Sequence, residues 1–246
     1  EEYADELTLS PSQFERALAC PLRWFLTTVG ADGPSNAAAS LGTLIHAVAE
    51  EHPHGTPEEL TEALEARIEE LGYNLDTWAG RHSDRRARAI VENLASYLVG
   101  VPGRVDVEQK VEAQVEGVTI RGRMDRLEYV DEGVRVTDLK TGGNPDPYRK
   151  VDENAQLAAY QLALLGSGED VAGARIALLG TKKKPQTFDQ KPLQGEALAQ
   201  WRNKVREVAE SARGPYFEAR PSDAACAYCS FDRLCPARER GHKVVE

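Results

Sequence analysis

The hydrophobic pattern changes at Gly103, and this change constrains the fold more than any other feature of the chain. Before it, apolar residues recur three and four apart, as in residues 39–52, which is the spacing of an amphipathic helix. After it, residues 104–115, 118–130 and 134–140 alternate between apolar and polar side chains and are separated by short turns. Such a pattern predicts a three-stranded antiparallel meander.

The remaining segments extend this framework on both sides. We expect helices at 10–27, 39–52, 57–71, 84–98, 152–166 and 195–213, and further strands at 173–180 and 187–193. The order is therefore helices, then β-β-β-α-β, then a last helix and a cysteine-containing tail. This order predicts a mixed α/β core with a helical N-terminal elaboration.

Composition narrows the function classes. The chain has 246 residues, 41% of them hydrophobic, and a formal net charge of −10. A protein that binds nucleic acid without specificity usually presents a basic face, so any DNA contact here must use a local patch.

We find no apolar run near the ~20 residues of a membrane span and no basic-then-apolar leader. We expect a cytoplasmic protein with reduced thiols. Because the chain begins with Glu1 and its only methionine is Met124, we also expect a piece of a longer protein or a processed product.

The stretch "VTDLKTGG" carries the first candidate site. Asp138 and Lys140 lie two apart and project from the same face of the predicted strand. If the preceding strand pairs with it, Asp125 can approach Asp138, and two close carboxylates repel unless a proton or a cation lies between them. Mg²⁺ prefers such oxygen ligands, and Lys140 could orient a water or steady a phosphate. A strand-end ion pair of Asp138 with Lys140 or Arg123 remains an alternative.

Three other polar residues occupy helical positions. His46 lies on or beside the apolar face of its helix, where a histidine is more often a satisfied core residue than a ligand. Gln156 and Tyr160 are four apart and share one helical face. Each observation alone fits ordinary packing.

The cysteines form a constellation of their own. Cys226, Cys229 and Cys235 follow the spacing C-x2-C-x5-C, and Cys20 lies about 200 residues earlier. Three thiols within ten residues fit ligation of a metal or cluster with one distant fourth ligand. Such a site would close a long loop and stabilise the fold by several kcal/mol. Free buried cysteines or two disulfides are the alternatives, and spacing alone does not separate Zn²⁺ from an iron–sulfur cluster.

Six motifs occur in a familiar order: "LSPSQFERALACPLRWFL", "GTLIHAVAE", "GRMDRLE", "VTDLKTG", "QLAAYQLAL" and "CAYCSFDRLCP". Together they resemble the RecB-like nucleases of the PD-(D/E)xK superfamily, above all the AddB-type and AdnB-type nuclease domains with an iron–sulfur staple and the CRISPR-associated exonucleases. The resemblance covers essentially the whole chain. It implies a restriction-endonuclease-like mixed β-sheet flanked by helices, in one domain of residues 1–246. Its parts would be a helical segment 1–102, a nuclease core 103–214 and an iron–sulfur tail 215–246 joined by Cys20.

The resemblance also assigns roles to single residues. The implied metal ligands, for Mg²⁺ or Mn²⁺, are His46, Asp125, Asp138 and the backbone carbonyl of Leu139. The implied catalytic lysine is Lys140, with Gln156 and Tyr160 positioning the lysine and the DNA strand, and Glu108 matches a frequent acidic position. The implied ligands of a [4Fe–4S] cluster, or less readily of Zn²⁺, are Cys20, Cys226, Cys229 and Cys235. Many superfamily members have Glu at the second acid, but RecB-like nucleases commonly use Asp there, as Asp138.

The implied activity is hydrolysis of DNA phosphodiester bonds, with single-stranded DNA as the expected substrate. The protein would be the exonuclease module of a helicase–nuclease complex that acts in double-strand break resection and recombinational repair. Its implied partners are a tethered helicase motor and a partner subunit. The alternatives are a silent DNA-guiding module with a structural cluster, a stand-alone CRISPR-type exonuclease, and an iron–sulfur electron carrier. The candidate DNA contacts are Arg121, Arg123, Arg126, Arg149, Lys150, Lys182, Lys183 and Lys184. For the three consecutive lysines, a solvated hairpin tip is the alternative.

Overall fold

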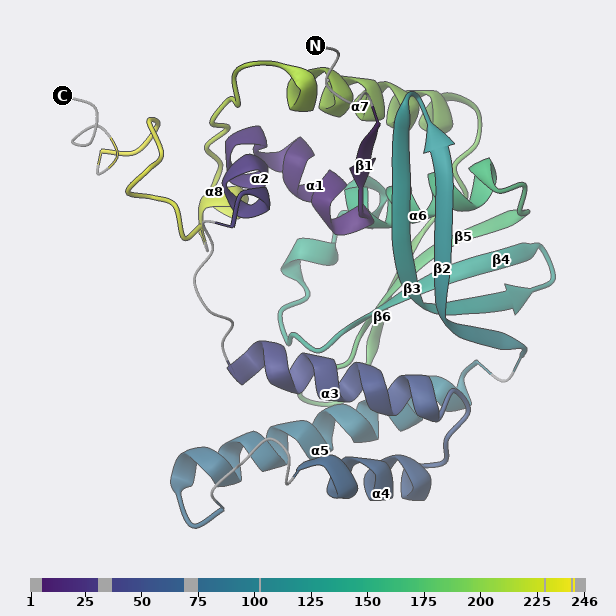
Figure 1. The fold of residues 1–246 in the computed structure, drawn as a ribbon. Coiled ribbons are helices and arrows are strands. Elements are labelled where there is room, and N and C mark those ends of the chain that lie inside the picture. Colours follow the sequence, from purple (N-terminus) through teal and green to yellow (C-terminus); the bar gives the residue numbers. More distant parts are fainter. Residues whose placement is uncertain are drawn as a thin grey trace.

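The computed structural model describes residues 6–30, 37–68, 75–101, 103–227, 229–239 and 241. A six-stranded mixed sheet forms its centre, and helices flank the sheet on both sides (Figure 1). The predicted mixed α/β fold is therefore confirmed.

Strand β3 organises the sheet. The strands are β1 (Leu7–Leu9), β2 (Val105–Val115), β3 (Val118–Val130), β4 (Gly133–Lys140), β5 (Val171–Leu178) and β6 (Gln186–Gln190). Their order is β1-β3-β4-β5-β6, and β2 pairs with β3 as well. The β2-β3-β4 meander is antiparallel, as the alternation predicts, whereas β1 pairs with β3 and β4 with β5 in parallel. Strand β1 has no counterpart among the strands expected from the sequence.

The helices fall close to the expected positions. They are α1 (Pro11–Ala19), α2 (Pro21–Thr28), α3 (Ala37–Glu51), α4 (Pro57–Ile68), α5 (Trp78–Val99), α6 (Ala155–Gly166), α7 (Gly195–Arg213) and α8 (Asp223–Cys226). Two 3₁₀ turns, η2 (Asp146–Tyr148) and η3 (Val151–Glu153), precede α6. None of the helices described is both long and apolar enough to cross a bilayer.

Most helix boundaries lie within three residues of the expected ones, and two differ more substantially. The single helix expected at 10–27 is two helices, because Cys20 adopts an extended conformation (φ −160°, ψ 103°) before Pro21, and proline disfavours helical geometry in the residue that precedes it. Helix α5 begins at Trp78 rather than at 84, because the Thr77 side chain accepts a hydrogen bond from the Gly80 N–H and caps it there. The last three residues of the helix expected at 57–71 lie outside the described residues.

The sheet separates two hydrophobic cores. On one face, α1, α2, α6 and α7 bury side chains such as Phe14, Leu157 and Trp201 against the strands. On the other, α3, α4 and α5 form a second cluster that includes Ile45 and Leu139, and they make up the lower helical layer of Figure 1. Residues of even number in β4 face the first core and those of odd number face the second. Asp138 and Lys140 therefore share the face covered by α6.

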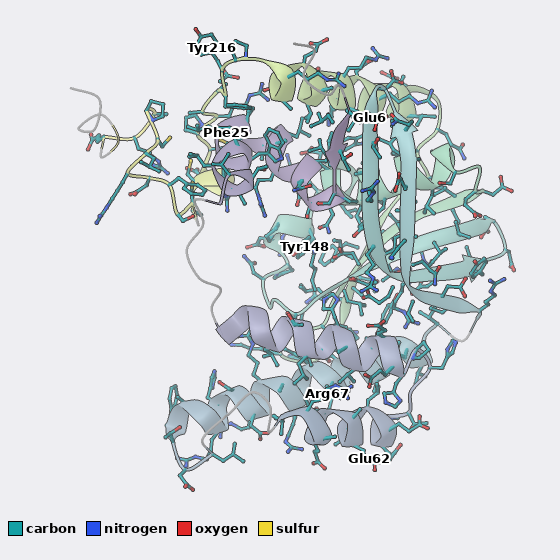
Figure 2. The ribbon with its side chains drawn as sticks, viewed as in Figure 1. Glu6, Phe25, Glu62, Arg67, Tyr148 and Tyr216 are labelled. Atoms are coloured by element: carbon teal, nitrogen blue, oxygen red, sulfur yellow. The ribbon has the colours of Figure 1, made fainter. Side chains whose placement is uncertain are left out.

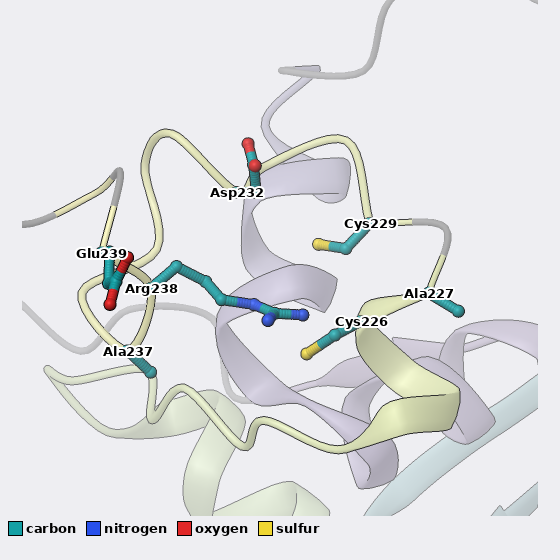
Figure 3. A pocket seen from close by; sticks show the side chains of 7 residues that line it. All are labelled: Cys226, Ala227, Cys229, Asp232, Ala237, Arg238 and Glu239. Atoms are coloured by element: carbon teal, nitrogen blue, oxygen red, sulfur yellow. The ribbon is translucent and has the colours of Figure 1, made fainter.

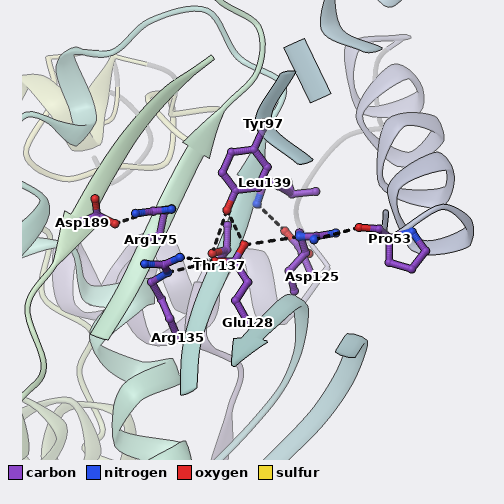
Figure 4. Close-up of polar contacts among 10 residues, drawn as sticks. Pro53, Tyr97, Asp125, Glu128, Arg135, Thr137, Leu139, Arg175 and Asp189 are labelled. Atoms are coloured by element: carbon purple, nitrogen blue, oxygen red, sulfur yellow. Dashed lines mark hydrogen bonds and ion pairs between the residues drawn. The ribbon is translucent and has the colours of Figure 1, made fainter. Parts of the chain in front are cut away.

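A buried polar cluster joins β3 and β4 to α5 (Figure 4). Glu128, which is 1% exposed, accepts hydrogen bonds from the Tyr97 hydroxyl and from Arg135. Arg126 is fully buried; its Nε lies 3.6 Å from Glu128 Oε1, and it donates to the Pro53 carbonyl at 3.1 Å. Arg126 thus neutralises a core carboxylate and cannot reach a bound strand. The prediction that Arg126 contacts DNA is wrong.

Candidate active site

The register of β3 and β4 brings the two predicted acids together. Arg126 is aligned with Thr137 in the antiparallel pair, so Asp125 and Asp138 occupy the next facing positions. Asp125 Oδ2 accepts a hydrogen bond from the Leu139 N–H at 2.7 Å (Figure 4). This bond fixes the carboxylate at the carboxyl end of β4.

Helix α3 and strand β2 add two more ligand atoms. His46 Nδ1 lies 3.3 Å from Asp125 Oδ1. Val107 pairs with Arg126 and Gln109 with Met124, which leaves Glu108 opposite Asp125. Glu108 has a φ of +50°, a left-handed conformation that is uncommon for a residue with a side chain and recurs at functional sites.

Ligand atoms of His46, Glu108 and Asp125 all lie within 4.8 Å of one another, and no other such group occurs in the described part of the chain. Two carboxylates and an imidazole suit Mn²⁺ or Mg²⁺ with waters completing the shell. Burial and the charge of Asp125 raise the pKa of Glu108, a repulsion that a bound cation would relieve. The donor set therefore fits a divalent ion.

Asp138 lies beside this group but its oxygens are engaged by other side chains. Lys140 Nζ lies 2.8 Å from Asp138 Oδ2 and donates to Gln156 Oε1 at 3.0 Å. Gln156 Nε2 in turn donates to Asp138 Oδ1 at 2.8 Å. Burial raises the pKa of Asp138, and the Lys140 ammonium opposes that rise. Burial also disfavours the charged form of Lys140, but the Asp138 carboxylate outweighs it, so the pKa of Lys140 is raised and the ammonium is retained.

Tyr160 supports the other strand. Its hydroxyl donates to the Arg123 carbonyl at 2.9 Å, two residues before Asp125. Burial, with the nearby Asp138 carboxylate, raises the pKa of Tyr160, so the phenol remains a hydrogen-bond donor. Gln156 and Tyr160 thus brace β4 and β3 respectively from one face of α6.

Two residues near Lys140 were not found from the sequence. Burial raises the pKa of Glu15, on α1, and Lys140 opposes that rise. Burial likewise raises the pKa of Tyr148 (labelled in Figure 2), with Lys140 again opposing that rise. The Tyr148 ring packs against Phe188, with 5.9 Å between the ring centroids. Glu15 lies within the first of the six motifs, but no role was assigned to it there, and Tyr148 lies outside all six. The one available signal was the polar face that Ser12, Glu15 and Arg16 present on α1.

The remaining DNA-contact candidates lie at the surface, most of them in ion pairs. Arg121 pairs with Glu112 and Arg123 with Glu108, while Arg149 pairs with Asp146 and Lys150 with Glu153.

The three lysines 182–184 are exposed on the β5–β6 turn. The Leu179 N–H donates to the Lys140 carbonyl at 2.8 Å, so this turn follows directly from the strand end that carries the site. Their contact with DNA stays a prediction.

The cysteines lie at the junction of α1, α2 and the tail. Cys20 Sγ accepts a hydrogen bond from the Arg220 N–H at 3.5 Å. Cys226 and Cys229 line a pocket of about 560 Å³ into which Arg238 reaches (Figure 3).

All four cysteines are free and partly exposed, and within the described residues their sulfurs are not gathered into a ligand group. Four thiols suit iron or zinc, but their arrangement is not that of an assembled site.

Aromatic packing holds the tail against α2. Phe25 stacks on Phe217 with ring centroids 4.1 Å apart, and Tyr216 beside it points to solvent (Figure 2). The Leu22 N–H donates to the Glu218 carbonyl, and Arg23 donates to the Ala225 carbonyl at 2.8 Å. The tail is therefore anchored even though its thiols are dispersed.

A family model described as the PD-(D/E)XK nuclease superfamily matches residues 8–236. The chain belongs to this superfamily. Members are nucleases. The observed group shares His46 and Asp125 with the metal ligands that the resemblance implies, and it contains Glu108 in place of Asp138.

Individual relatives are more distant. The Gene 69 protein of Mycobacterium phage D29 is 27% identical over an alignment that, gaps included, has 267 positions and covers 92% of this chain and 96% of the phage protein. The Gene 69 protein of Mycobacterium phage L5 is 26% identical over 53% of this chain and 44% of its own length. The crystal structure of a protein from Eubacterium rectale named "Putative exonuclease" superposes with a TM-score of 0.55 at 14% identity, over 92% of this chain and 86% of that one. This last likeness concerns the fold alone.

Proposed function

We propose that the protein is a Mg²⁺- or Mn²⁺-dependent deoxyribonuclease that degrades single-stranded DNA as an exonuclease. The observation that carries the proposal is the ligand group His46, Glu108 and Asp125, set directly beside the Asp138–Lys140–Gln156 network. A nuclease superfamily that uses divalent ions explains why a fold would gather these groups at one strand end.

Each residue of the site has a distinct proposed role. His46, Glu108 and Asp125 would hold the ion. The resemblance adds Asp138 and the Leu139 carbonyl as further ligands, and Asp138 would then have to give up a contact with Lys140 or Gln156. When bound, a divalent ion lowers the pKa of a coordinated water and neutralises phosphate charge. Lys140, kept protonated and aimed by Asp138 and Gln156, stabilises the negative charge that develops on the phosphate oxygens. Its ammonium therefore acts more strongly on the transition state than on the bound substrate.

The cellular role has two candidates. The motif order supports a module of a helicase–nuclease complex in resection of double-strand breaks, fed by a tethered motor that replaces intrinsic affinity by effective concentration. The D29 relative supports a stand-alone nuclease, because this chain spans 96% of that protein. Processive degradation by the isolated chain would favour the second role, and weak activity rescued by a motor subunit would favour the first.

We further propose that Cys20, Cys226, Cys229 and Cys235 hold a [4Fe–4S] cluster. Support comes from the spacing of the four thiols and from the anchoring of the tail beside Cys20. The visible absorption spectrum of anaerobically purified protein tests this, since thiolate-bound iron absorbs in the visible range. A colourless protein that contains stoichiometric zinc would overturn the cluster and leave the zinc alternative.

The nuclease proposal is tested with a labelled single-stranded oligonucleotide. Cleavage should require Mg²⁺ or Mn²⁺ and should be lost in Asp138→Ala and in Lys140→Ala. Matched controls are Asp131→Ala and Lys191→Ala, which remove the same charges from exposed positions. A wild-type protein that binds DNA but leaves it intact in either metal would instead identify a silent guiding module.

A further inference from the structure

A second pocket opens beside Lys140, away from the ligand group. Its volume is about 490 Å³, and α1, α2, α6, α8 and β4 all contribute to its wall. Its polar lining consists of Ser12, Glu15, Arg16, Arg23, Lys140 and Gln156. Because Lys140 and Gln156 belong to the Asp138 network, the pocket continues directly from the proposed site of hydrolysis.

The pocket concentrates positive charge in a protein whose net charge is −10. Even with Lys140 balanced by Asp138, two guanidinium groups face the single carboxylate of Glu15. Such a local excess of cations in an acidic protein points to an anionic ligand. The volume lies in the range of pockets that hold small ligands or parts of larger ones.

The two arginines differ in what already engages them. Arg23 donates to the Ala225 carbonyl at 2.8 Å and so helps to hold α8 in place. The Arg16 guanidinium has no hydrogen bond or ion pair within the described residues, although it is only partly exposed and lines the pocket. Ser12, four residues earlier on α1, lies on the same helical face and adds a hydroxyl donor.

We propose that this pocket binds a second phosphate of the DNA strand, adjacent to the scissile one, with Arg16 as its principal ligand. The planar guanidinium offers a fork of N–H donors that matches a phosphate, and this geometry makes arginine the preferred residue for such contacts. The inference rests on the proposed nuclease function and names how that function holds its substrate. A contact to the backbone positions the strand without selecting its sequence.

Two kinds of phosphate on a DNA strand fit this pocket. The bound group is either an internal phosphodiester of a strand that continues past the pocket or the terminal phosphate of a strand that ends in it. The first arrangement allows cleavage within a strand. In the second, the bound terminal phosphate sets the distance from the strand end at which cleavage occurs. Chemically modified oligonucleotides distinguish the two arrangements.

The test measures binding of single-stranded oligonucleotides by fluorescence anisotropy without divalent ions, so that no cleavage occurs. We expect Arg16→Gln to weaken binding about 10-fold, the effect of losing one charge-assisted hydrogen-bonding partner. The slope of log K against log salt should also become shallower by about 0.7, the value for one phosphate contact on a single strand. Arg85→Gln, which removes an exposed arginine from α5, should change affinity less than about twofold. In Mg²⁺, Arg16→Gln should raise KM more than it lowers kcat.

Modified strands locate the phosphate. If a neutral methylphosphonate at one internal linkage weakens binding to wild type but not to Arg16→Gln, the ligand is an internal phosphate. If only replacement of a terminal phosphate by a hydroxyl has this effect, the ligand is the strand end.

The same affinity and salt slope for wild type and Arg16→Gln on every strand would overturn the proposal. Should Arg16→Gln fail to fold by circular dichroism, Arg16→Lys decides the question, since it keeps the charge but loses the fork and should weaken binding to an intermediate degree. A wild type that binds but does not cleave would defeat the nuclease proposal while leaving the pocket proposal standing.

Discussion

The two ligand groups of this protein are built in opposite ways. His46, Glu108 and Asp125 come from α3, β2 and β3, and their ligand atoms already lie within 4.8 Å of one another. The four cysteines come from the α1–α2 junction and the tail; all four are partly exposed, and no three of them form a ligand group within the described residues. The first group is placed by packing between two hydrophobic cores. The second depends on a tail whose only described helix, α8, has four residues.

The two groups therefore imply different roles for their ions. A preformed site binds an ion without reorganising the fold, so its loss should remove activity and little else. A site assembled by its ion gains folding free energy from that ion, as in small metal-stapled domains. Three substitutions test this contrast.

The largest effect is expected from Asp125→Asn, which removes a charged ligand from the preformed group while keeping its shape. Cleavage should fall more than about 100-fold, because even indirect partners of a metal ligand are worth 10- to 100-fold. The melting temperature should stay close to wild type. Single-turnover cleavage and a thermal melt measure both quantities, and a variant that cleaves normally in Mg²⁺ would remove Asp125 from the site.

Cys229→Ser should act on stability instead. Losing one ligand opens a loop of about 200 residues between Cys20 and the tail, which costs as much as about 4 kcal/mol on the disulfide analogy. We expect a lower melting temperature of metal-loaded protein. Ala227→Ser, which places a serine on the same segment at an exposed position, is the control. Identical melts for the two variants would mean that the thiols form no staple.

Gln156→Leu should have the smallest effect of the three. It deprives Asp138 of a donor and Lys140 of an acceptor, so kcat should fall about 10- to 100-fold with KM nearly unchanged. Gln161→Leu, on the same helix, loses hydrogen bonds to Gln190 and to the Leu193 N–H without touching Asp138. That control should lower stability but not kcat. If Gln156→Leu instead lowered stability and left kcat unchanged, Gln156 would have a role in packing alone.

Much of the fold was predictable from local pattern. Alternation predicts the β2-β3-β4 meander, and the two-residue spacing of Asp138 and Lys140 predicts their shared face. Strand β1 was missed because three residues give too little alternation, and its parallel pairing with β3 spans about 110 residues. The break between α1 and α2 was readable in principle, since Cys20 precedes a proline.

The site was predictable in part. Pairing of the two acid-bearing strands follows from the meander, but the approach of His46 depends on how α3 packs, which no local pattern encodes. Arg126 was grouped with Arg121 and Arg123 because all three surround the Asp125 motif. In a strand, however, an even-numbered residue lies on the opposite face from its odd-numbered neighbours. The burial of Arg126 is explained by Glu128, a core carboxylate two residues further along the same strand, which also pairs with Arg135 on β4.

The left-handed backbone of Glu108 has a consequence for the substitutions that this position can accept. In a library of all substitutions at position 108, we expect two independent properties to decide how well each residue is tolerated: whether it can adopt the left-handed backbone conformation, and whether it keeps a carboxylate that can bind the metal. Glycine, asparagine and aspartate suit the conformation, yet of these only aspartate keeps a carboxylate, and valine or isoleucine, ordinarily good strand residues, should be among the worst tolerated. The substitutions accepted at position 108 would therefore depend on backbone conformation. At the neighbouring positions of β2, burial and side-chain volume would decide which substitutions are accepted.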